Sequence, residues 1–165
     1  MSEFASTVGF VVIVILYASV GVLAVFGSIF VTQKLFSPRH EQVFYGLFLV
    51  AIAAFYLAFA AYFGARSSWA VESTAVALFA MLGLAGTRLP AALILGYPLH
   101  GLWDLLHEWH AHASAVIVAP EQLTPIPLGY GVFCLVFDIG IAAYFVTAKT
   151  TWIEDWKAQQ FTPQA

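Results

Sequence analysis

The residues of this chain that could do chemistry lie inside or beside apolar segments. His100, Asp104 and His107 follow one another at helical spacing. At 100° per residue, Asp104 falls about 40° and His107 about 20° from the direction of His100, so all three share one narrow stripe of a helix. Glu72 and Asp138 lie in neighbouring apolar segments. An ionisable group at the centre of a membrane span costs at least about 2.5 to 3.5 kcal/mol on insertion scales, which makes each of these residues a candidate for a functional role.

These residue types together predict a metal site. Imidazole nitrogen and carboxylate oxygen suit zinc or iron, and further carboxylates orient ligating histidines. We expect His100, His107 and Asp138 to bind one divalent metal ion. Glu72 or Asp104 would then act as the general base or would orient a ligand.

A purely structural role is the competing interpretation. His100 could donate a hydrogen bond to Asp138, with Trp103 or Tyr130 satisfying the remaining polar atoms, and such a polar knot would fix the helix register. The number of ionisable groups favours the metal site, because a knot needs two partners and five such groups occupy the outer half of the bundle. A proton path from Asp138 through His100 outward is a third option, but it stops halfway, because residues 139–148 are uncharged.

Several other chemistries are excluded or disfavoured by the motifs. The run His107–His112 is not a HExxH zinc motif, because Ala111 stands where the second histidine would be needed. Five histidines are fewer than the roughly eight of the membrane di-iron desaturases. His40 is the only histidine away from the fourth apolar segment, so a bis-histidine haem is disfavoured, whereas a single axial ligand to a pigment remains open at His100.

The elements that position these residues are membrane-spanning helices. The 165 residues are 62% hydrophobic and only 9% charged, whereas a soluble domain carries about 25% charged residues. A span of about 30 Å of hydrocarbon needs about 20 residues. We therefore expect an all-α, polytopic membrane helix bundle forming a single membrane domain over residues 1–165, with five transmembrane helices at about 4–31, 43–65, 69–85, 89–106 and 126–148.

Charge distribution predicts the orientation of this bundle. With five spans, one face receives five basic residues and the other only Arg66; the five are Lys34, Arg39, Arg88, Lys149 and Lys157. Lysine and arginine are retained on the cytoplasmic side, so we expect the N-terminus outside and the C-terminus in the cytoplasm. The polar stripe then lies in the outer half, next to an outer loop at 108–125. Residues 151–165 are expected to form an interfacial tail.

The sequence also limits the partners. A formal net charge of −3 leaves no basic face for nucleic acid, and a lone cysteine, Cys134, forms no intramolecular disulfide. Membrane lipid is the expected surrounding. Other membrane subunits are a possible partner, since the chain is small, apolar and rich in aromatic residues.

The chain resembles a family of small bacterial multi-span membrane proteins known only as a domain of unknown function. The resemblance rests on Val71-Glu72, on the run from His100 to His107 with its His-x-x-Trp-Asp-x-x-His pattern, and on Phe137-Asp138. It covers roughly residues 43–148 and does not account for His110 and His112. It implies a bacterial source, hence the plasma (inner) membrane, and supports grouping the five ionisable residues, but it implies no activity.

Two functional hypotheses result. The first is a metal-dependent membrane enzyme that acts on a lipid-soluble substrate by hydrolysis or proton transfer. The second is a non-catalytic accessory subunit of a larger respiratory or photosynthetic membrane complex, in which the same residues lock helices or ligate a pigment.

Overall fold

The computed structural model of the protein describes residues 3–63, 66–112 and 123–160. This part of the chain is all-α and contains no strand, as expected. The helices in chain order are α1 (Glu3–Leu35), α2 (Pro38–Phe63), α3 (Ser68–Gly86), α4 (Pro90–His112) and α5 (Tyr130–Gln160).

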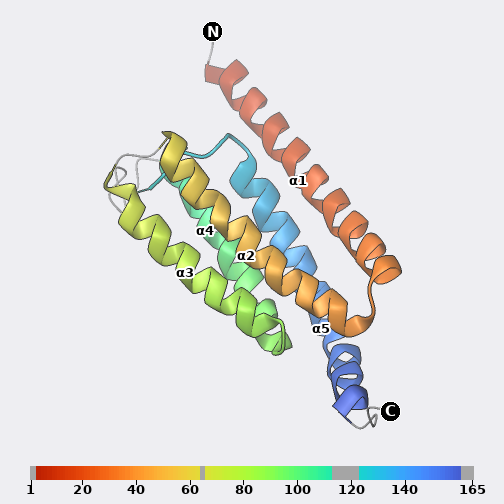
Figure 1. The fold of residues 1–165 in the computed structure, drawn as a ribbon. Helices are drawn as coiled ribbons and strands as arrows, with labels where there is room; N and C mark the ends of the chain where they lie inside the picture. Colours follow the sequence, from red (N-terminus) through yellow and green to blue (C-terminus); the bar gives the residue numbers. More distant parts are fainter. Residues whose placement is uncertain (1–2, 64–65, 113–122, 161–165) are drawn as a thin grey trace.

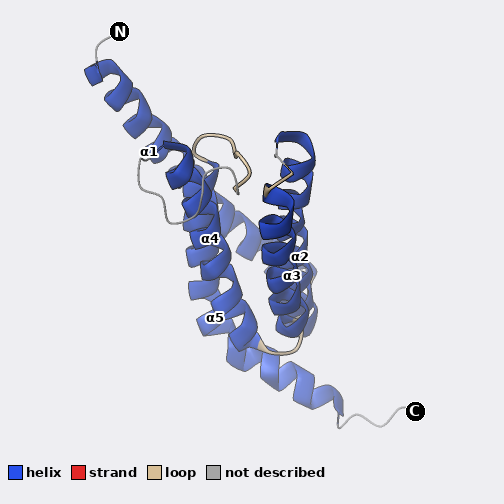
Figure 2. Cartoon of the chain, turned by 90° about the vertical axis from the view of Figure 1, so that its left-hand side faces the viewer, coloured by secondary structure: helices blue, strands red, loops and turns tan. Residues whose placement is uncertain are grey.

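The helices form two antiparallel pairs that face each other. α2 packs along α3, α4 packs along α5, and α1 lies against α5 on the outer side of the second pair. Figure 2 shows α2 and α3 on one side of the molecule and α1, α4 and α5 on the other. The N-terminal part of α1 and the C-terminal part of α5 project beyond the other helices at opposite ends (Figure 1). A residue on the inner face of α4 therefore looks across toward α2 and α3.

The composition of the helices indicates a membrane protein. Within the described ranges, α1, α2, α3 and α5 are each long and apolar enough to cross a membrane. α4 is 23 residues long but falls outside this set, because the polar residues of its stripe lower its hydropathy. A fifth crossing by α4 and the direction of insertion stay predictions.

α4 and α5 extend furthest beyond the ends of the spans that the sequence analysis expects. α4 continues to His112 and so includes the first part of the stretch assigned to an outer loop, because no glycine or proline interrupts it after Gly101. Residues 113–122 lie outside the described ranges. α5 likewise runs on to Gln160, so the part of the expected tail up to that residue is helical.

Glycines let the first helix pair approach to backbone contact. A Cβ atom added at Gly46 of α2 would lie 2.6 Å from the carbonyl oxygen of Gly83, and one added at Gly83 would lie 2.5 Å from the carbonyl oxygen of Gly46. Real Cβ atoms do not come this close to another atom, so both positions require glycine. This contact fixes α2 against α3 and thereby places the side chains that both helices direct toward α4.

Glu108 of α4 holds the start of α5. Its carboxylate accepts the backbone N–H of Gly129 at 2.6 Å and that of Gly131 at 2.8 Å. Gly129 has φ +82°, a left-handed conformation that glycine adopts without strain. The carboxylate thus satisfies otherwise free amide groups at a helix N-terminus, where negative charge is favoured.

Replacing Glu108 with Ala is expected to destabilise the protein by about 1.5–3 kcal/mol, because buried N–H groups at the start of α5 lose a charged acceptor. Thermal unfolding in detergent measures this loss. Glu154→Ala is the matched control, because Glu154 is exposed on α5. Its unfolding midpoint should equal that of the wild type within experimental error. Equal midpoints for both variants would contradict the capping role.

Candidate metal centre

The polar stripe of α4 points into the space between the two helix pairs. His100 and Asp104 are completely buried, and His107 is 2% exposed. Asp138 of α5 and Glu72 of α3 are buried as well. The structure thus gathers all five residues singled out from the sequence between α3, α4 and α5, where it divides them into two groups.

The first group consists of His100, Asp104 and Asp138. The Nδ1 atom of His100 lies 2.9 Å from Oδ2 of Asp138 and 3.4 Å from Oδ2 of Asp104. One potential ligand atom from each residue lies within 4.8 Å of the others. A tetrahedral ion whose ligands are about 2.0–2.2 Å away separates them by roughly 3.3–3.6 Å, so small side-chain rotations suffice to close this group around a metal.

The second group is a pair between α4 and α3. His107 Nε2 lies 2.9 Å from Oε1 of Glu72, and the same oxygen accepts the backbone N–H of Thr124 at 2.8 Å. His107 Nδ1 donates to the carbonyl oxygen of Trp103 at 2.9 Å. Nδ1 therefore carries a proton, and the hydrogen bond between Nε2 and Glu72 needs a second one. Whether this second proton is bound to His107 or to Glu72, the net charge of the pair is zero.

This arrangement differs in detail from the expected ligand set. His100 and Asp138 do lie together, but the third member of their group is Asp104, which the sequence analysis considers as a base or an orienting residue. His107, an expected ligand, contacts Glu72 instead. Of the remaining histidines, His110 lies 3.1 Å from the carbonyl oxygen of Leu106, and the side chain of His112 lies outside what the structure describes.

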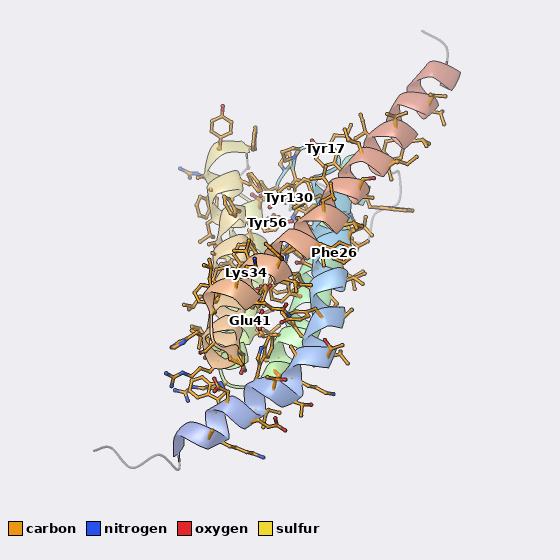
Figure 3. The ribbon with its side chains drawn as sticks, turned by 90° about the vertical axis from the view of Figure 1, so that its right-hand side faces the viewer. Tyr17, Phe26, Lys34, Glu41, Tyr56 and Tyr130 are labelled. Atoms are coloured by element: carbon orange, nitrogen blue, oxygen red, sulfur yellow. The ribbon has the colours of Figure 1, made fainter. Side chains whose placement is uncertain are left out.

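Tyr56 is a member of the site that the sequence analysis does not identify. Its hydroxyl donates to Oδ1 of Asp104, and its ring lies 4.7 Å from the ring of His107 and 6.4 Å from that of His100, measured between centroids. Figure 3 places Tyr56 near Tyr130, in the half of the bundle toward the start of α1. Its position in the middle of an expected span could have identified it, since a buried phenolic hydroxyl needs a hydrogen-bond partner.

Several polar atoms of the site have no hydrogen-bond partner among the described residues. They belong to side chains of α3, α4 and α5, and they are Glu72 Oε2, His100 Nε2, Trp103 Nε1, Asp104 Oδ2 and Asp138 Oδ1. Unsatisfied buried polar atoms are rare in folded proteins and indicate an ion, a water molecule or a ligand group. Their concentration here means that the site can accommodate an ion, water molecules or a polar ligand group.

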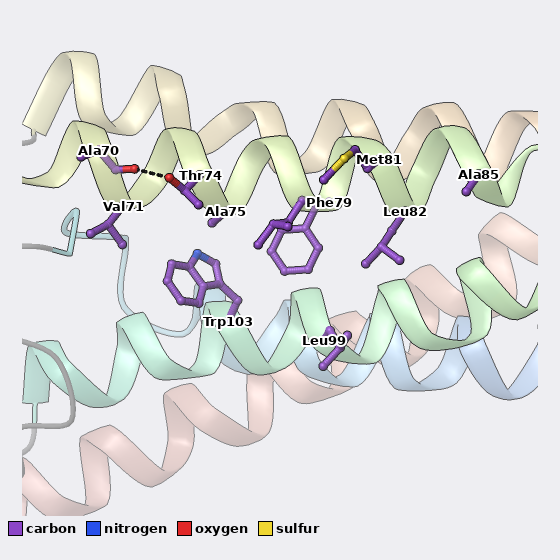
Figure 4. Close-up of a pocket in the computed structure, with 11 residues that line it drawn as sticks. Ala70, Val71, Thr74, Ala75, Phe79, Met81, Leu82, Ala85, Leu99 and Trp103 are labelled. Atoms are coloured by element: carbon purple, nitrogen blue, oxygen red, sulfur yellow. Dashed lines mark hydrogen bonds between the residues drawn. The ribbon is translucent and has the colours of Figure 1, made fainter.

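An apolar groove of about 1020 Å³ runs beside the site between α3 and α4. Figure 4 shows Trp103 and Leu99 of α4 facing Phe79, Ala75 and Leu82 of α3 across it. Trp103 and Phe79 also lie between the groove and the polar residues of the site. The ring of Trp103 lies 5.0 Å from that of His107, and the ring of Phe79 lies 5.1 Å from that of His100.

The fold and the site together define a helical membrane protein with a buried His/Asp/Glu centre. Residues 12–151 match a family of unknown function (DUF6010), and the chain belongs to this family. The match is longer than the stretch on which the resemblance was based and includes most of α1. No curated protein and no solved structure matches the chain.

If the group of His100, Asp104 and Asp138 binds a divalent metal, Tyr56→Phe should weaken that binding by about 10- to 100-fold, the usual effect of losing a hydrogen bond to a metal ligand. The substitution removes one hydroxyl and keeps the ring that packs against His107. Tyr62→Phe is the control, because Tyr62 is 82% exposed on the same helix. Isothermal titration with zinc measures both affinities, and an unchanged affinity in Tyr56→Phe would exclude Tyr56 from the centre.

Proposed function

We propose that the protein is a membrane enzyme that uses one divalent metal ion, zinc or iron, bound by His100, Asp104 and Asp138. Its substrate is lipid-soluble and enters along the groove between α3 and α4. In this proposal α4 is a fifth membrane span, the C-terminus lies in the cytoplasm, and the membrane is the plasma membrane of a bacterium.

The charge of the site is the observation that carries this proposal. Glu72, Asp104 and Asp138 are at most 1% exposed, and within the described ranges the only basic side chains with a nitrogen within 4.0 Å of their oxygens are His100 and His107. The Glu72–His107 pair is neutral, which leaves two carboxylates beside one imidazole. A divalent cation balances both carboxylates and lets His100 remain neutral, as a metal ligand must be. Without it, one carboxylate must take up a proton or keep an uncompensated buried charge, and either is energetically costly.

The remaining residues supply the other requirements of a catalytic site. Three protein ligands leave coordination positions open, as in catalytic rather than structural zinc sites. A bound divalent ion would act as a Lewis acid toward an ester, amide or phosphoryl oxygen. The Glu72–His107 pair lies beside this group and can accept or return a proton, which makes Glu72 the proposed general base.

The groove determines the class of substrate. Its walls are almost entirely aliphatic and aromatic, with Thr74 the only hydroxyl-bearing residue among those that line it. Such a groove fits an acyl or isoprenoid chain. A chain lying along α3 and α4 would bring its polar end to Trp103, whose buried indole Nε1 has no partner among the described residues.

Metal content and turnover test this proposal together. Wild-type protein loaded with zinc and then desalted should retain about one zinc per chain, and His100→Gln should retain at least about tenfold less. His40→Gln is the control, since His40 lies at the other end of the bundle, where its Nδ1 atom is 2.9 Å from Oγ of Ser37. Zinc retention that is equal in all three proteins would overturn the proposal.

Glu72→Gln separates the base from the ligands. It should keep the metal and lose turnover of lipid esters or phosphoesters in mixed micelles by about 100-fold or more, as expected for removal of a general base. Products are followed by mass spectrometry. Turnover equal to that of the wild type would assign Glu72 to structure alone.

An accessory subunit is the second candidate, and α1 is the observation that favours it. This helix contacts mainly α5 and exposes large apolar side chains, Leu23 and Phe26 among them, along its length. Such a surface fits lipid or another membrane subunit. Extraction in mild detergent distinguishes the two: stoichiometric co-purification with larger membrane proteins supports the subunit, and a monodisperse single chain that binds metal supports the enzyme.

A further inference from the structure

A second buried carboxylate lies at the opposite end of the bundle from the candidate metal centre. Glu41, in the first turn of α2, is 5% exposed. Figure 3 shows it far along α2 from Tyr56. Thr32 donates to its Oε1 at 2.8 Å, the hydroxyl of Tyr144 lies 2.9 Å from both of its oxygens, and the indole of Trp152 donates to Oε2 at 3.0 Å. Three helices thus converge on one carboxylate.

All of these donors are neutral. They stabilise the carboxylate as an anion, because each directs a hydroxyl or indole hydrogen at it, but they leave its charge uncompensated. No lysine, arginine or histidine nitrogen of the described chain lies within 4.0 Å of Glu41. A buried negative charge without a counter-charge attracts a cation.

A pocket of about 360 Å³ opens beside this carboxylate. Glu41 lines it together with the aromatic side chains of Phe36, Tyr144 and Trp152, and with Gln33 and Pro38. The volume lies in the range of small-molecule sites and far exceeds that of a bare ion. Calcium and magnesium also prefer six or more oxygen ligands, often from several carboxylates, whereas aromatic faces around a single anion attract an organic ammonium group through cation–π interactions.

We propose that this pocket binds an organic ammonium group, with Glu41 as its counter-ion and Phe36, Tyr144 and Trp152 as its walls. The group can belong to the headgroup of an aminophospholipid or to a free amine. The pocket lies at the end of the bundle where charge distribution predicts the cytoplasmic interface, and lipid headgroups lie at such an interface. It shares no residue with the candidate metal centre, and the two proposals are independent.

Native mass spectrometry of the full chain tests the lipid source. Protein in micelles containing equal amounts of phosphatidylethanolamine and phosphatidylglycerol should retain one phosphatidylethanolamine preferentially. Glu41→Gln should reduce this retention by about tenfold, the size of one desolvated cation–π or ionic contact. Glu154→Gln, which removes an exposed carboxylate from α5, should behave as the wild type.

Ethanolamine distinguishes the lipid from the free amine. Titrated calorimetrically into protein in phosphatidylglycerol nanodiscs, it should bind the wild type and not Glu41→Gln if the free amine suffices. Retention of phosphatidylethanolamine without ethanolamine binding assigns the site to the lipid headgroup. If neither probe distinguishes Glu41→Gln from the wild type, the proposal is overturned.

Phe36→Leu keeps the test decisive if Glu41→Gln does not fold. Phe36 is 37% exposed and makes no hydrogen bond to Glu41, so its replacement by an aliphatic residue leaves the carboxylate network intact. The variant should fold and bind the ammonium probe several-fold more weakly. Unchanged binding in a folded Phe36→Leu variant would contradict the aromatic walls.

Discussion

The Asp104→Asn/Asp138→Asn double variant is expected to unfold at a higher temperature than the wild type when both are measured in a chelator. The wild type without metal buries two carboxylates beside one imidazole. Replacing buried ion pairs with well-packed hydrophobic residues is often neutral or stabilises a protein by about 1–4 kcal/mol, and asparagine likewise removes the buried charge. For a chain of this length that corresponds to roughly 2–16 °C. Asparagine keeps an acceptor for the Tyr56 hydroxyl and one for His100 Nδ1.

Zinc should reverse this order. At a free concentration of 100 times its dissociation constant, a ligand of the folded state contributes about 2.7 kcal/mol, so zinc should raise the midpoint of the wild type by several degrees. It should leave the double variant unchanged. Thermal unfolding in detergent, with chelator or with zinc, gives all four values. A double variant that unfolds below the wild type in chelator, with no response to zinc in either protein, would identify the carboxylates as parts of a structural hydrogen-bonded knot.

Gly46→Ala is expected to destabilise the bundle by about 1–3 kcal/mol or more, the cost of overpacking a close contact. The new methyl group would lie 2.6 Å from the carbonyl oxygen of Gly83 and 2.8 Å from the side chain of Thr87. A backbone carbonyl cannot rotate away, so α2 and α3 must separate. Their separation would also move Tyr56 and Glu72 away from α4.

Gly27→Ala is the matched control for this prediction. A Cβ atom at Gly27 meets nothing within 4 Å in the structure, and alanine is favoured over glycine within a helix by roughly 0.5–1 kcal/mol. Thermal unfolding should therefore place Gly27→Ala at or above the wild type and Gly46→Ala well below it. Equal stability of the two variants would show that α2 and α3 do not pack through their glycines.

The part of this account that sequence predicts best is local. The spacing of His100, Asp104 and His107 places them on one face whatever the helix packs against, and Asp104 could not face lipid without an unpaired charge. The pairing of His100 with Asp138 follows from similar depths in two consecutive spans. These expectations need only helix geometry and the cost of burying charge.

The part that sequence does not predict depends on how the helix pairs meet. Tyr56 contacts Asp104 because α2 and α3 pack as a unit against α4. For the same reason His107 contacts Glu72 and does not join His100, Asp104 and Asp138. Residue periodicity within one helix does not predict how one helix pair is oriented against the other. The same is true of Glu41, whose partners Tyr144 and Trp152 lie more than 100 positions away along the chain.

X-ray absorption at the zinc edge tests the central claim most directly. Zinc-loaded wild-type protein should give nitrogen and oxygen neighbours at about 2.0–2.2 Å, with the outer-shell signature of a single imidazole and no sulfur neighbour at about 2.3 Å. The Asp104→Asn/Asp138→Asn variant should give no bound zinc. A wild-type spectrum with sulfur, with two or more imidazoles, or with only fully hydrated zinc would contradict a centre made of His100, Asp104 and Asp138.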